Sequence, residues 1–326
     1  MSTDIVAVDI GGTHARFAIA SIAGNGTIEL GDPVTLHTET HASFQTAWEH
    51  FREEMGGSVP DKVAMAVAGR IKPDIIRFTN NPWIIRPPLI AEKLGCEKHL
   101  IVNDFEAVAH AAARAPAEEF LHLAGPEEDL PETGTISVLG PGTGLGVAHF
   151  WRASAADYRV QATEGGHGDF APLDAIEDAI LARLRKRHNR VSTERVVSGP
   201  AIIDIYQTLA AVEGRAVVEM DDVAIWTAGT DGSDSLAAAA VDRFCLSLGS
   251  VAGDIALVQG ASGVVIAGGL GYRIRDTLIS SGFASRFRAK GRFASLMGTL
   301  PVKLITHPQP GLLGAAAAFE QHVNRI

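Results

Sequence analysis

The strongest constraint on the fold is a glycine turn that lies between two short apolar runs near the amino terminus. Residues 5–8 form an apolar run of strand length, residues 11–13 read Gly-Gly-Thr, and residues 15–20 alternate as a second strand does. This order predicts a β-hairpin with glycines at its bend. Because glycine lets backbone amides approach a ligand closely, the bend is also a candidate phosphate site.

A second unit of the same type follows about 130 residues later. Residues 135–139 and 147–151 are strand-like and enclose a turn that is rich in glycine, residues 140–146. The letters differ between the two units, but each turn contains a Gly-Thr pair. We interpret the pair as a weak internal duplication, and we expect the two hairpins to face one site.

Two familiar nucleotide-binding motifs do not fit these turns. The dinucleotide fingerprint must open a helix, whereas a strand-like segment follows each turn here, and no Walker G-x-x-x-x-G-K-[ST] occurs. The pair of phosphate-binding hairpins found in actin-like ATPases and sugar kinases does fit. Asp9, just before the first turn, suits a Mg²⁺ ion held through water. The structural alternative is two ordinary tight hairpins.

Strand-like and helix-like segments alternate along the chain, which predicts an α/β protein. The length of 326 residues suggests about two domains, and a content of 46% hydrophobic and 20% charged residues is typical of a folded globular chain. Helices are expected at 41–56, 107–115, 173–188, 235–258 and 311–322, and another is expected to open at Gly268-Gly269. Further strands are expected at 62–68, 99–102, 263–267 and 302–305.

The charge and the cysteine content narrow the function classes. With 28 basic and 38 acidic residues the net charge is −10, which argues against partners such as nucleic acid and anionic membranes. The two cysteines, Cys96 and Cys245, are too few for a disulfide framework or a Cys-rich zinc site and favour a cytoplasmic protein. No signal peptide is expected, and the longest uncharged stretches, 133–151 and 255–272, are too rich in glycine and polar residues for a membrane span.

Asn103 and Asp104 follow an apolar strand and precede a helix. Ligands of α/β sheets bind at the carboxyl ends of strands, so a carboxylate here can accept the proton of an attacking hydroxyl while Asn103 fixes the substrate. The alternative is structural, because Asp is also a favoured N-cap for the helix that follows.

Three further polar residues are candidates for binding a polyhydroxylated ligand. Glu164 and His167 are three residues apart across two glycines, so both side chains can turn toward one small ligand. The carboxylate can accept hydrogen bonds from hydroxyls, and the imidazole can also donate to them. A zinc site is a weaker alternative, because no cysteine or second histidine lies nearby in the sequence. Glu194 follows a helical segment, and its alternative interpretation is an ordinary surface glutamate.

Six motifs, taken in order, resemble the bacterial glucokinases of the proteobacterial type and cover nearly the whole chain. They are Asp9-Ile-Gly-Gly-Thr-His, Asn103-Asp-Phe, Gly142-Thr-Gly-Leu-Gly-Val-Ala, Glu164-Gly-Gly-His, Glu194-Arg-Val-Val-Ser-Gly-Pro and His307-Pro-Gln-Pro-Gly-Leu-Leu-Gly. The resemblance implies that ATP phosphorylates the 6-hydroxyl of glucose in glycolysis, with Mg²⁺. It also implies a role for each matching residue: Asp104 as general base; Asn103, Glu164, His167 and Glu194 on the sugar; Asp9, Gly11, Gly12, Thr13, Gly142, Thr143 and Gly144 on the phosphates and Mg²⁺; Gly268 and Gly269 beside the adenosine.

The resemblance further implies a two-domain actin-like ATPase (ribonuclease H-like) fold with an interdomain active-site cleft, and a homodimer. We expect residues 1–114 and 307–326 to form a small domain and residues 115–306 a large one. The related ROK (repressor, ORF, kinase) sugar kinases carry a Cys-rich zinc motif beside the sugar-site histidine. It is missing after His167, so no zinc is expected.

Three other functions remain open on the sequence. The polar residues that are expected to bind the sugar hydroxyls do not distinguish one hexose from another, so fructose, mannose or an amino sugar could be the substrate. A sugar-sensing regulator would need a DNA-binding segment, and an assembling actin-like ATPase would not need the sugar-binding residues. The basic stretch 286–293 has no role that the sequence reveals.

Overall fold

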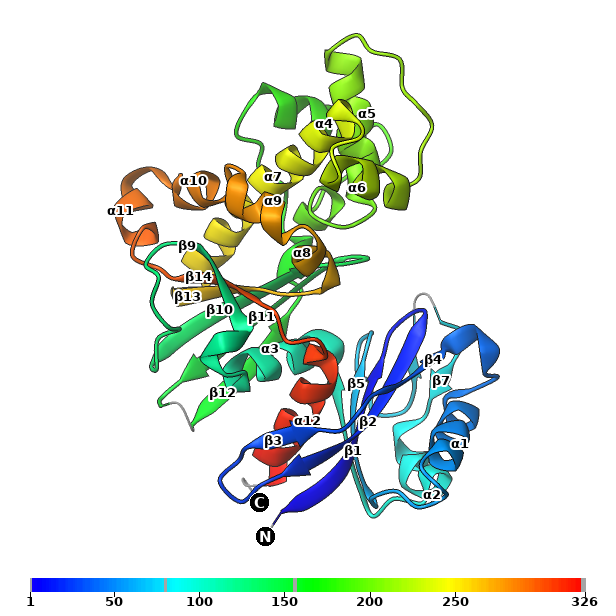
Figure 1. Cartoon of the computed structure of the whole chain (residues 1–326). Coiled ribbons are helices and arrows are strands. Elements are labelled where there is room, and N and C mark those ends of the chain that lie inside the picture. Colours follow the sequence, from blue (N-terminus) through cyan, green and yellow to red (C-terminus); the bar gives the residue numbers. More distant parts are fainter. Residues whose placement is uncertain (1, 79–80, 155–156, 324–326) are drawn as a thin grey trace. The chain divides into compact units, whose positions relative to one another are not determined.

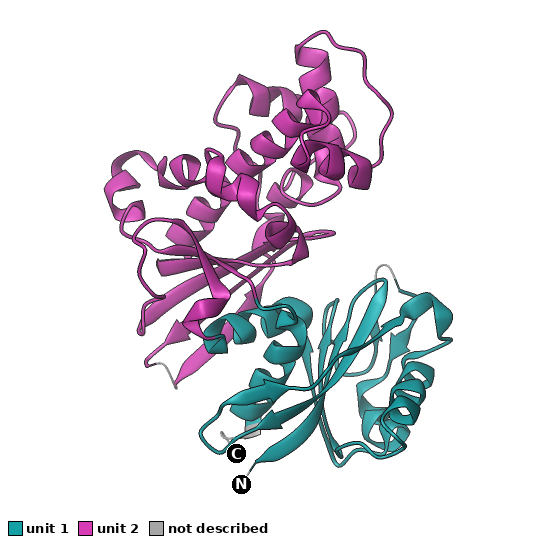
Figure 2. Cartoon of the chain, viewed as in Figure 1, with its two compact units in different colours: residues 1–115, 307–326 teal, residues 116–306 magenta. Residues whose placement is uncertain are grey.

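The computed structural model describes residues 2–78, 81–154 and 157–323. The chain divides into two compact units: unit 1 contains residues 1–115 and 307–326, and unit 2 contains residues 116–306 (Figure 2). Each unit combines a six-stranded sheet with helices, which confirms the α/β class.

The sheet of unit 1 has the order β3-β2-β1-β5-β8, with β4 also beside β2 (Figure 1). Its strands are β1 (Thr3–Ile10), β2 (His14–Ile22), β3 (Ile28–Leu30), β4 (Val34–His37), β5 (Lys62–Val67) and β8 (Lys98–Asn103). Strands β1 and β2 form the predicted antiparallel hairpin, whereas β1, β5 and β8 run parallel. A strand rather than a helix therefore follows the first glycine turn, which confirms that the dinucleotide motif is excluded.

Helices cover both faces of this sheet. Val6 and Val8 belong to a core shared with α1 (Phe44–Glu54) and α2 (Ile90–Leu94), while Ile5 and Ala7 belong to a core shared with α3 and α12. Because both faces are buried, β1 is a continuous apolar run rather than an alternating one. Helices α3 (Asp104–Arg114) and α12 (Pro310–Val323) pack against each other. The C-terminal helix α12 therefore belongs to unit 1, together with the N-terminal part of the chain. A short ladder, β6 (Ile76–Arg77) with β7 (Ile84–Ile85), completes the unit.

The sheet of unit 2 has the order β12-β11-β10-β13-β14-β9, and its first five strands repeat the order of unit 1, whereas β9 has no counterpart there. Its strands are β9 (Phe120–Ala124), β10 (Gly134–Pro141), β11 (Leu145–Arg152), β12 (Tyr158–Thr163), β13 (Ala261–Ile266) and β14 (Val302–Ile305). As in unit 1, an antiparallel hairpin with a glycine turn lies beside two parallel strands. The shared strand order supports the internal duplication inferred from the sequence.

Unit 2 is also rich in helix: α4 (Ala175–Arg185), α5 (Ala201–Val212), α6 (Asp222–Thr230), α7 (Ser235–Gln259), α8 (Gly269–Arg273), α9 (Arg275–Ser280), α10 (Phe283–Arg288) and α11 (Ala294–Met297). By length and composition α7 could cross a membrane, but most of its apolar stretch is buried inside the unit, as in the core helix of a globular protein. Its large apolar side chains pack against α5, α6 and α10.

The basic stretch near α10 has a structural role that the sequence did not reveal. Arg286 donates to Asp174 at the start of α4 and lies 3.6 Å from the buried carboxylate of Glu177. The Lys290 ammonium lies 2.7 Å from Asp254 on α7. These ion pairs join α10 and the residues after it to two other helices, and they give Arg286 and Lys290 a structural role that needs no ligand.

Candidate functional site

The first glycine turn, between β1 and β2, is held through its carbonyl groups. Thr38 donates its backbone N–H to the carbonyl of Thr13 (2.9 Å) and its hydroxyl to that of Gly12 (2.9 Å), and the buried Asn81 amide donates to that of Gly11 (3.2 Å). Within the described residues, the amides of Gly12 and Thr13 make no hydrogen bond. The turn is thus fixed from one side and offers two N–H groups on the other, as an anion-binding turn requires.

Asp9 lies on β1, a few residues before these amides. Arg16, its ladder partner on β2, donates to the Asp9 carboxylate at 3.2 Å. The first turn of α12 also touches this carboxylate: a Cβ at Gly311 would lie 2.6 Å from Asp9 Oδ2, so only glycine fits there. Burial raises the pKa of Asp9, and the Arg16 guanidinium opposes that rise.

Asn103 and Asp104 lie at the carboxyl end of β8, where α3 begins. The N-cap of α3 is Asn103, whose side-chain oxygen accepts from the amides of Phe105 (2.9 Å) and Glu106 (3.2 Å). Its side-chain nitrogen donates to the carbonyl of Gly69 (3.1 Å), which fixes the orientation of the amide and leaves one N–H for a ligand. The alternative interpretation of Asp104 as the N-cap is therefore wrong.

The Asp104 carboxyl, like that of Asp9, has a raised pKa. Burial raises its pKa to about 6, the amide of Phe105 opposes that rise by hydrogen bonding, and the nearby charge of Asp9 adds to it. A carboxyl group with this pKa is ionised at neutral pH but still basic enough to accept a proton, as a general base must. The structure thus brings Asp9, Asp104 and the first turn together at one edge of the unit 1 sheet.

The second glycine turn, between β10 and β11, is held differently. The amide of Gly142 donates to the carbonyl of Gly144 (2.8 Å), and the Gly142 carbonyl accepts from the amide of Gly199 (2.7 Å). Within the described residues, the amides of Thr143 and Gly144 make no hydrogen bond. This turn therefore also offers two successive N–H groups.

Glu194 lies directly on this second turn. Its carboxylate accepts the amide of Leu145 at 2.9 Å and packs so tightly that a Cβ at Gly144 would lie 2.4 Å from Oε2. The sequence suggested a sugar-binding or surface glutamate, and nothing local to residues 193–195 indicated this contact. The half-buried position shows that the surface interpretation is wrong.

Glu164 and His167 lie on the short turn that follows β12. Their side chains are exposed, at 84% and 56%, and the Glu164 Oε2 and His167 Nε2 atoms are 3.8 Å apart. The spacing therefore brings carboxylate and imidazole side by side, as expected, and leaves both open to a ligand. Among the described residues no group of three or more His, Cys, Asp or Glu side chains could hold a metal ion.

Gly268 lies beside the second turn. Its φ is 91°, and a Cβ at this position would lie 3.1 Å from the Pro141 carbonyl oxygen, so both the backbone conformation and the close approach require glycine. Gly269, which begins α8, is exposed and has open space around it.

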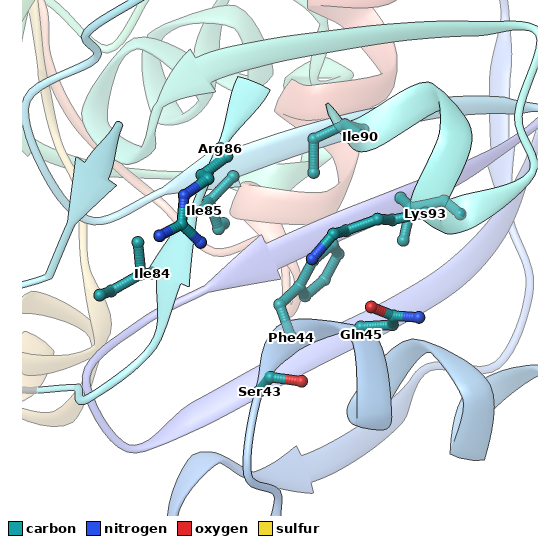
Figure 3. A pocket seen from close by; sticks show the side chains of 9 residues that line it. Ser43, Phe44, Gln45, Ile84, Ile85, Arg86, Ile90 and Lys93 are labelled. Atoms are coloured by element: carbon teal, nitrogen blue, oxygen red, sulfur yellow. The ribbon is translucent and has the colours of Figure 1, made fainter. Parts of the chain in front are cut away.

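A small pocket in unit 1 is not part of either cluster (Figure 3). It is lined by residues 43–45, residues 84–86 and three residues of α2, and none of the predicted site residues is among them. Its volume of about 60 Å³ is far below the ~300–1,000 Å³ that is usual for ligand pockets. It does not have room for a hexose or a nucleotide.

Comparison with known proteins agrees with the motifs. The sequence model of the Glucokinase family matches residues 6–322. A glucokinase of Zymomonas mobilis is 53% identical over 323 residues, which cover 99% of this chain and 99% of that protein. A glucokinase of Caulobacter vibrioides is 40% identical over 317 residues, covering 95% and 93%.

Solved structures agree as well. The crystal structure of a glucokinase from an Antarctic psychrotroph superposes with a TM-score of 0.86 at 33% identity, covering 98% of this chain and 99% of that one. A ROK family glucokinase from Streptomyces griseus, solved with glucose and AMPPNP, has a TM-score of 0.64 at 18% identity, covering 98% and 99%, and supports the fold alone. These matches confirm the actin-like ATPase fold, and the chain belongs to the glucokinase family.

Proposed function

We propose that this chain transfers the γ-phosphoryl group of ATP to the 6-hydroxyl of D-glucose, with Asp104 as the general base. The observation that carries the proposal is the half-buried Asp104 carboxyl at the end of β8, whose pKa is raised to about 6 beside Asp9 and a turn with free amides. Relatives that are 53% and 40% identical over almost their whole length are glucokinases, which supports the choice of reaction and substrate.

In this mechanism Asp104 accepts the proton of the sugar hydroxyl as that oxygen attacks the γ-phosphorus. Asn103 holds the sugar with its remaining N–H, since its other polar atoms are bound to backbone. Glu164, His167 and Glu194 bind further hydroxyls, because each can pair with a group that both donates and accepts. Positioning and charge neutralisation supply most of the catalysis in phosphoryl transfer.

The two glycine turns hold the phosphates. Free amides of Gly12 and Thr13 in unit 1, and of Thr143 and Gly144 in unit 2, are the donors. Gly11 and Gly142 let the chain curl at each turn, and Gly268 and Gly269 leave room for the adenosine.

Asp9 fits the requirements of Mg²⁺, which usually keeps several waters and takes one or two carboxylates together with substrate phosphates. Its carboxylate lies beside the first turn and near Asp104, while Arg16 occupies one of its oxygens. When bound, Mg²⁺ neutralises charge on the phosphates. No zinc is needed in this proposal, and the described residues offer no cluster for it.

The finer properties belong to the same proposal. The enzyme is a cytoplasmic homodimer of glycolysis that acts without nucleic acid or membrane, and its small domain comprises residues 1–114 and 307–326, with 115–306 as the large domain. A kinase for fructose, mannose or an amino sugar is the second candidate, because the same polar groups would bind any hexose. A non-catalytic sugar-sensing regulator is the third and is less well supported.

A coupled assay of ADP release, run with ATP and a panel of hexoses, tests this function. We expect glucose to give the highest kcat/KM, with little ADP release in the absence of sugar. A higher kcat/KM for another hexose would move the assignment to that sugar. Equal ADP release with and without sugars would contradict the kinase assignment altogether.

A further inference from the structure

The Glu194 carboxylate occupies an amide of the turn that would bind phosphate. Glu194 Oε2 accepts a hydrogen bond from the N–H of Leu145 at 2.9 Å. Leu145 directly follows Thr143 and Gly144, whose amides are free. A Cβ at Gly144 would lie 2.4 Å from Glu194 Oε2, so the side chain rests on the turn itself. A negative charge is thus placed where an anionic phosphate would have to bind.

The segment that carries Glu194 also contacts the loop of Glu164 and His167. The Thr193 hydroxyl donates to the carbonyl of Gly166 at 2.6 Å, and the Thr193 amide donates to the carbonyl of Gly168 at 2.8 Å. Gly166 packs in turn on Leu145, since a Cβ there would lie 2.3 Å from the Leu145 carbonyl oxygen. Three segments, 142–145, 164–168 and 193–199, therefore form one connected group.

We propose that Glu194 is a positioning residue that couples sugar binding to nucleotide binding. Without sugar, its carboxylate holds the Leu145 amide and repels phosphate from the second turn. When hydroxyls of the hexose take the carboxylate, the Leu145 amide is released and joins Thr143 and Gly144 as a third donor. The nucleotide then binds more tightly to the sugar complex than to the free enzyme. This inference rests on the proposed sugar-binding role of Glu194.

Calorimetric titration of Mg²⁺-AMPPNP, with and without glucose, tests the coupling. We expect glucose to tighten AMPPNP binding to the wild-type chain by about 5-fold or more, within the usual range of coupling between two sites. In Glu194→Gln, sugar-free affinity should rise toward the value of the glucose complex, so the ratio should fall toward one. Glu219→Gln makes the same change of charge on an exposed residue elsewhere in unit 2 and should leave the ratio unchanged.

A second measurement follows the amide itself and does not need a variant. In protein labelled with ¹⁵N-leucine, the Leu145 amide should lose its carboxylate hydrogen bond on glucose addition, with an upfield proton shift and faster hydrogen exchange. Two results would overturn the coupling: a Leu145 signal that glucose leaves unchanged, or a sugar-free AMPPNP affinity that Glu194→Gln leaves unchanged. In either case the wild-type chain could still phosphorylate glucose. Loss of the proposed function would instead appear as absent glucose-dependent ADP release in the wild-type chain.

Discussion

The two glycine turns have the same topology but differ in what occupies them. In unit 1 the turn is held through its carbonyl groups by Thr38 and Asn81, and neither of these side chains is acidic. In unit 2 the carboxylate of Glu194 is bound to the turn at Leu145. Both turns nevertheless offer two successive free amides within the described parts of the chain.

The difference shows how one duplicated hairpin can serve two purposes. The first turn lies beside Asp9 and Asp104, whose carboxylates are fixed by Arg16, Gly311 and the start of α3, so it is a rigid part of the proposed reaction centre. The second turn is instead contacted by the far end of the long Glu194 side chain, which has more rotatable bonds than the side chain of Asp9. Changes beside the first turn should therefore lower kcat, while changes beside the second should alter nucleotide affinity.

Replacement of Asp104 by alanine should have the largest effect. Because proton transfer to a positioned base is usually worth ~10²–10⁴-fold, kcat for glucose should fall by about that factor while glucose affinity changes little. Glu106→Ala is the matched control, two residues further along the first turn of α3 and also acidic. Near-normal turnover in Asp104→Ala, measured by ADP release, would remove Asp104 from the role of base.

Replacing one glycine beside each turn by alanine should distinguish the roles of the two turns. A Cβ at Gly311 would lie 2.6 Å from the Asp9 carboxylate, which is held by Arg16 and cannot easily retreat, so Gly311→Ala should lower kcat by about 10-fold or more, the equivalent of ~1.4 kcal/mol. A Cβ at Gly144 would lie 2.4 Å from the far end of Glu194, which can rotate away, so Gly144→Ala should change kcat less. Steady-state kinetics of both variants checks this; equal losses of kcat would remove the distinction between the turns.

Neutralising Asp104 should stabilise unit 1. The folded-state pKa of about 6 lies above the ordinary value of 3.8, so ionisation of Asp104 at neutral pH opposes folding. Asp104→Asn should increase the free energy of unfolding at pH 7 by about 1–3 kcal/mol, and the gain should shrink as the pH falls from 6 toward 4. Urea unfolding at both pH values measures it, and a variant that is less stable at pH 7 would contradict the pKa assignment.

The elements that could be predicted from the sequence are those with a local signal. Both hairpins were predicted because strand alternation and glycine turns depend on neighbouring residues only, and helices α1, α4 and α7 were predicted from their apolar spacing. Helix α5 was missed although Ile202, Ile205 and Leu209 show the same spacing. The short strands such as β3 and β6 contain too few residues to show a period.

Parts of the candidate site could not be predicted because they depend on residues distant in sequence. The contact of Glu194 with Leu145 joins residues 49 positions apart, and the approach of Gly311 to Asp9 joins the two ends of the chain. The capping role of Asn103 rather than Asp104 depended on which of two adjacent polar side chains turns toward α3. The raised pKa of Asp104 needs both burial and the charge of Asp9, neither of which a motif contains.

The pH dependence of kcat/KM for glucose tests most directly the claim that Asp104 is a base made effective by burial and by Asp9. Because the base must be ionised, kcat/KM should be constant near neutral pH and should fall tenfold per pH unit below a pKa of about 6. This fall of kcat/KM at acidic pH should be lost in the residual activity of Asp104→Ala. A wild-type profile that stays flat down to pH 4.5, or an unchanged fall in Asp104→Ala, would contradict the account.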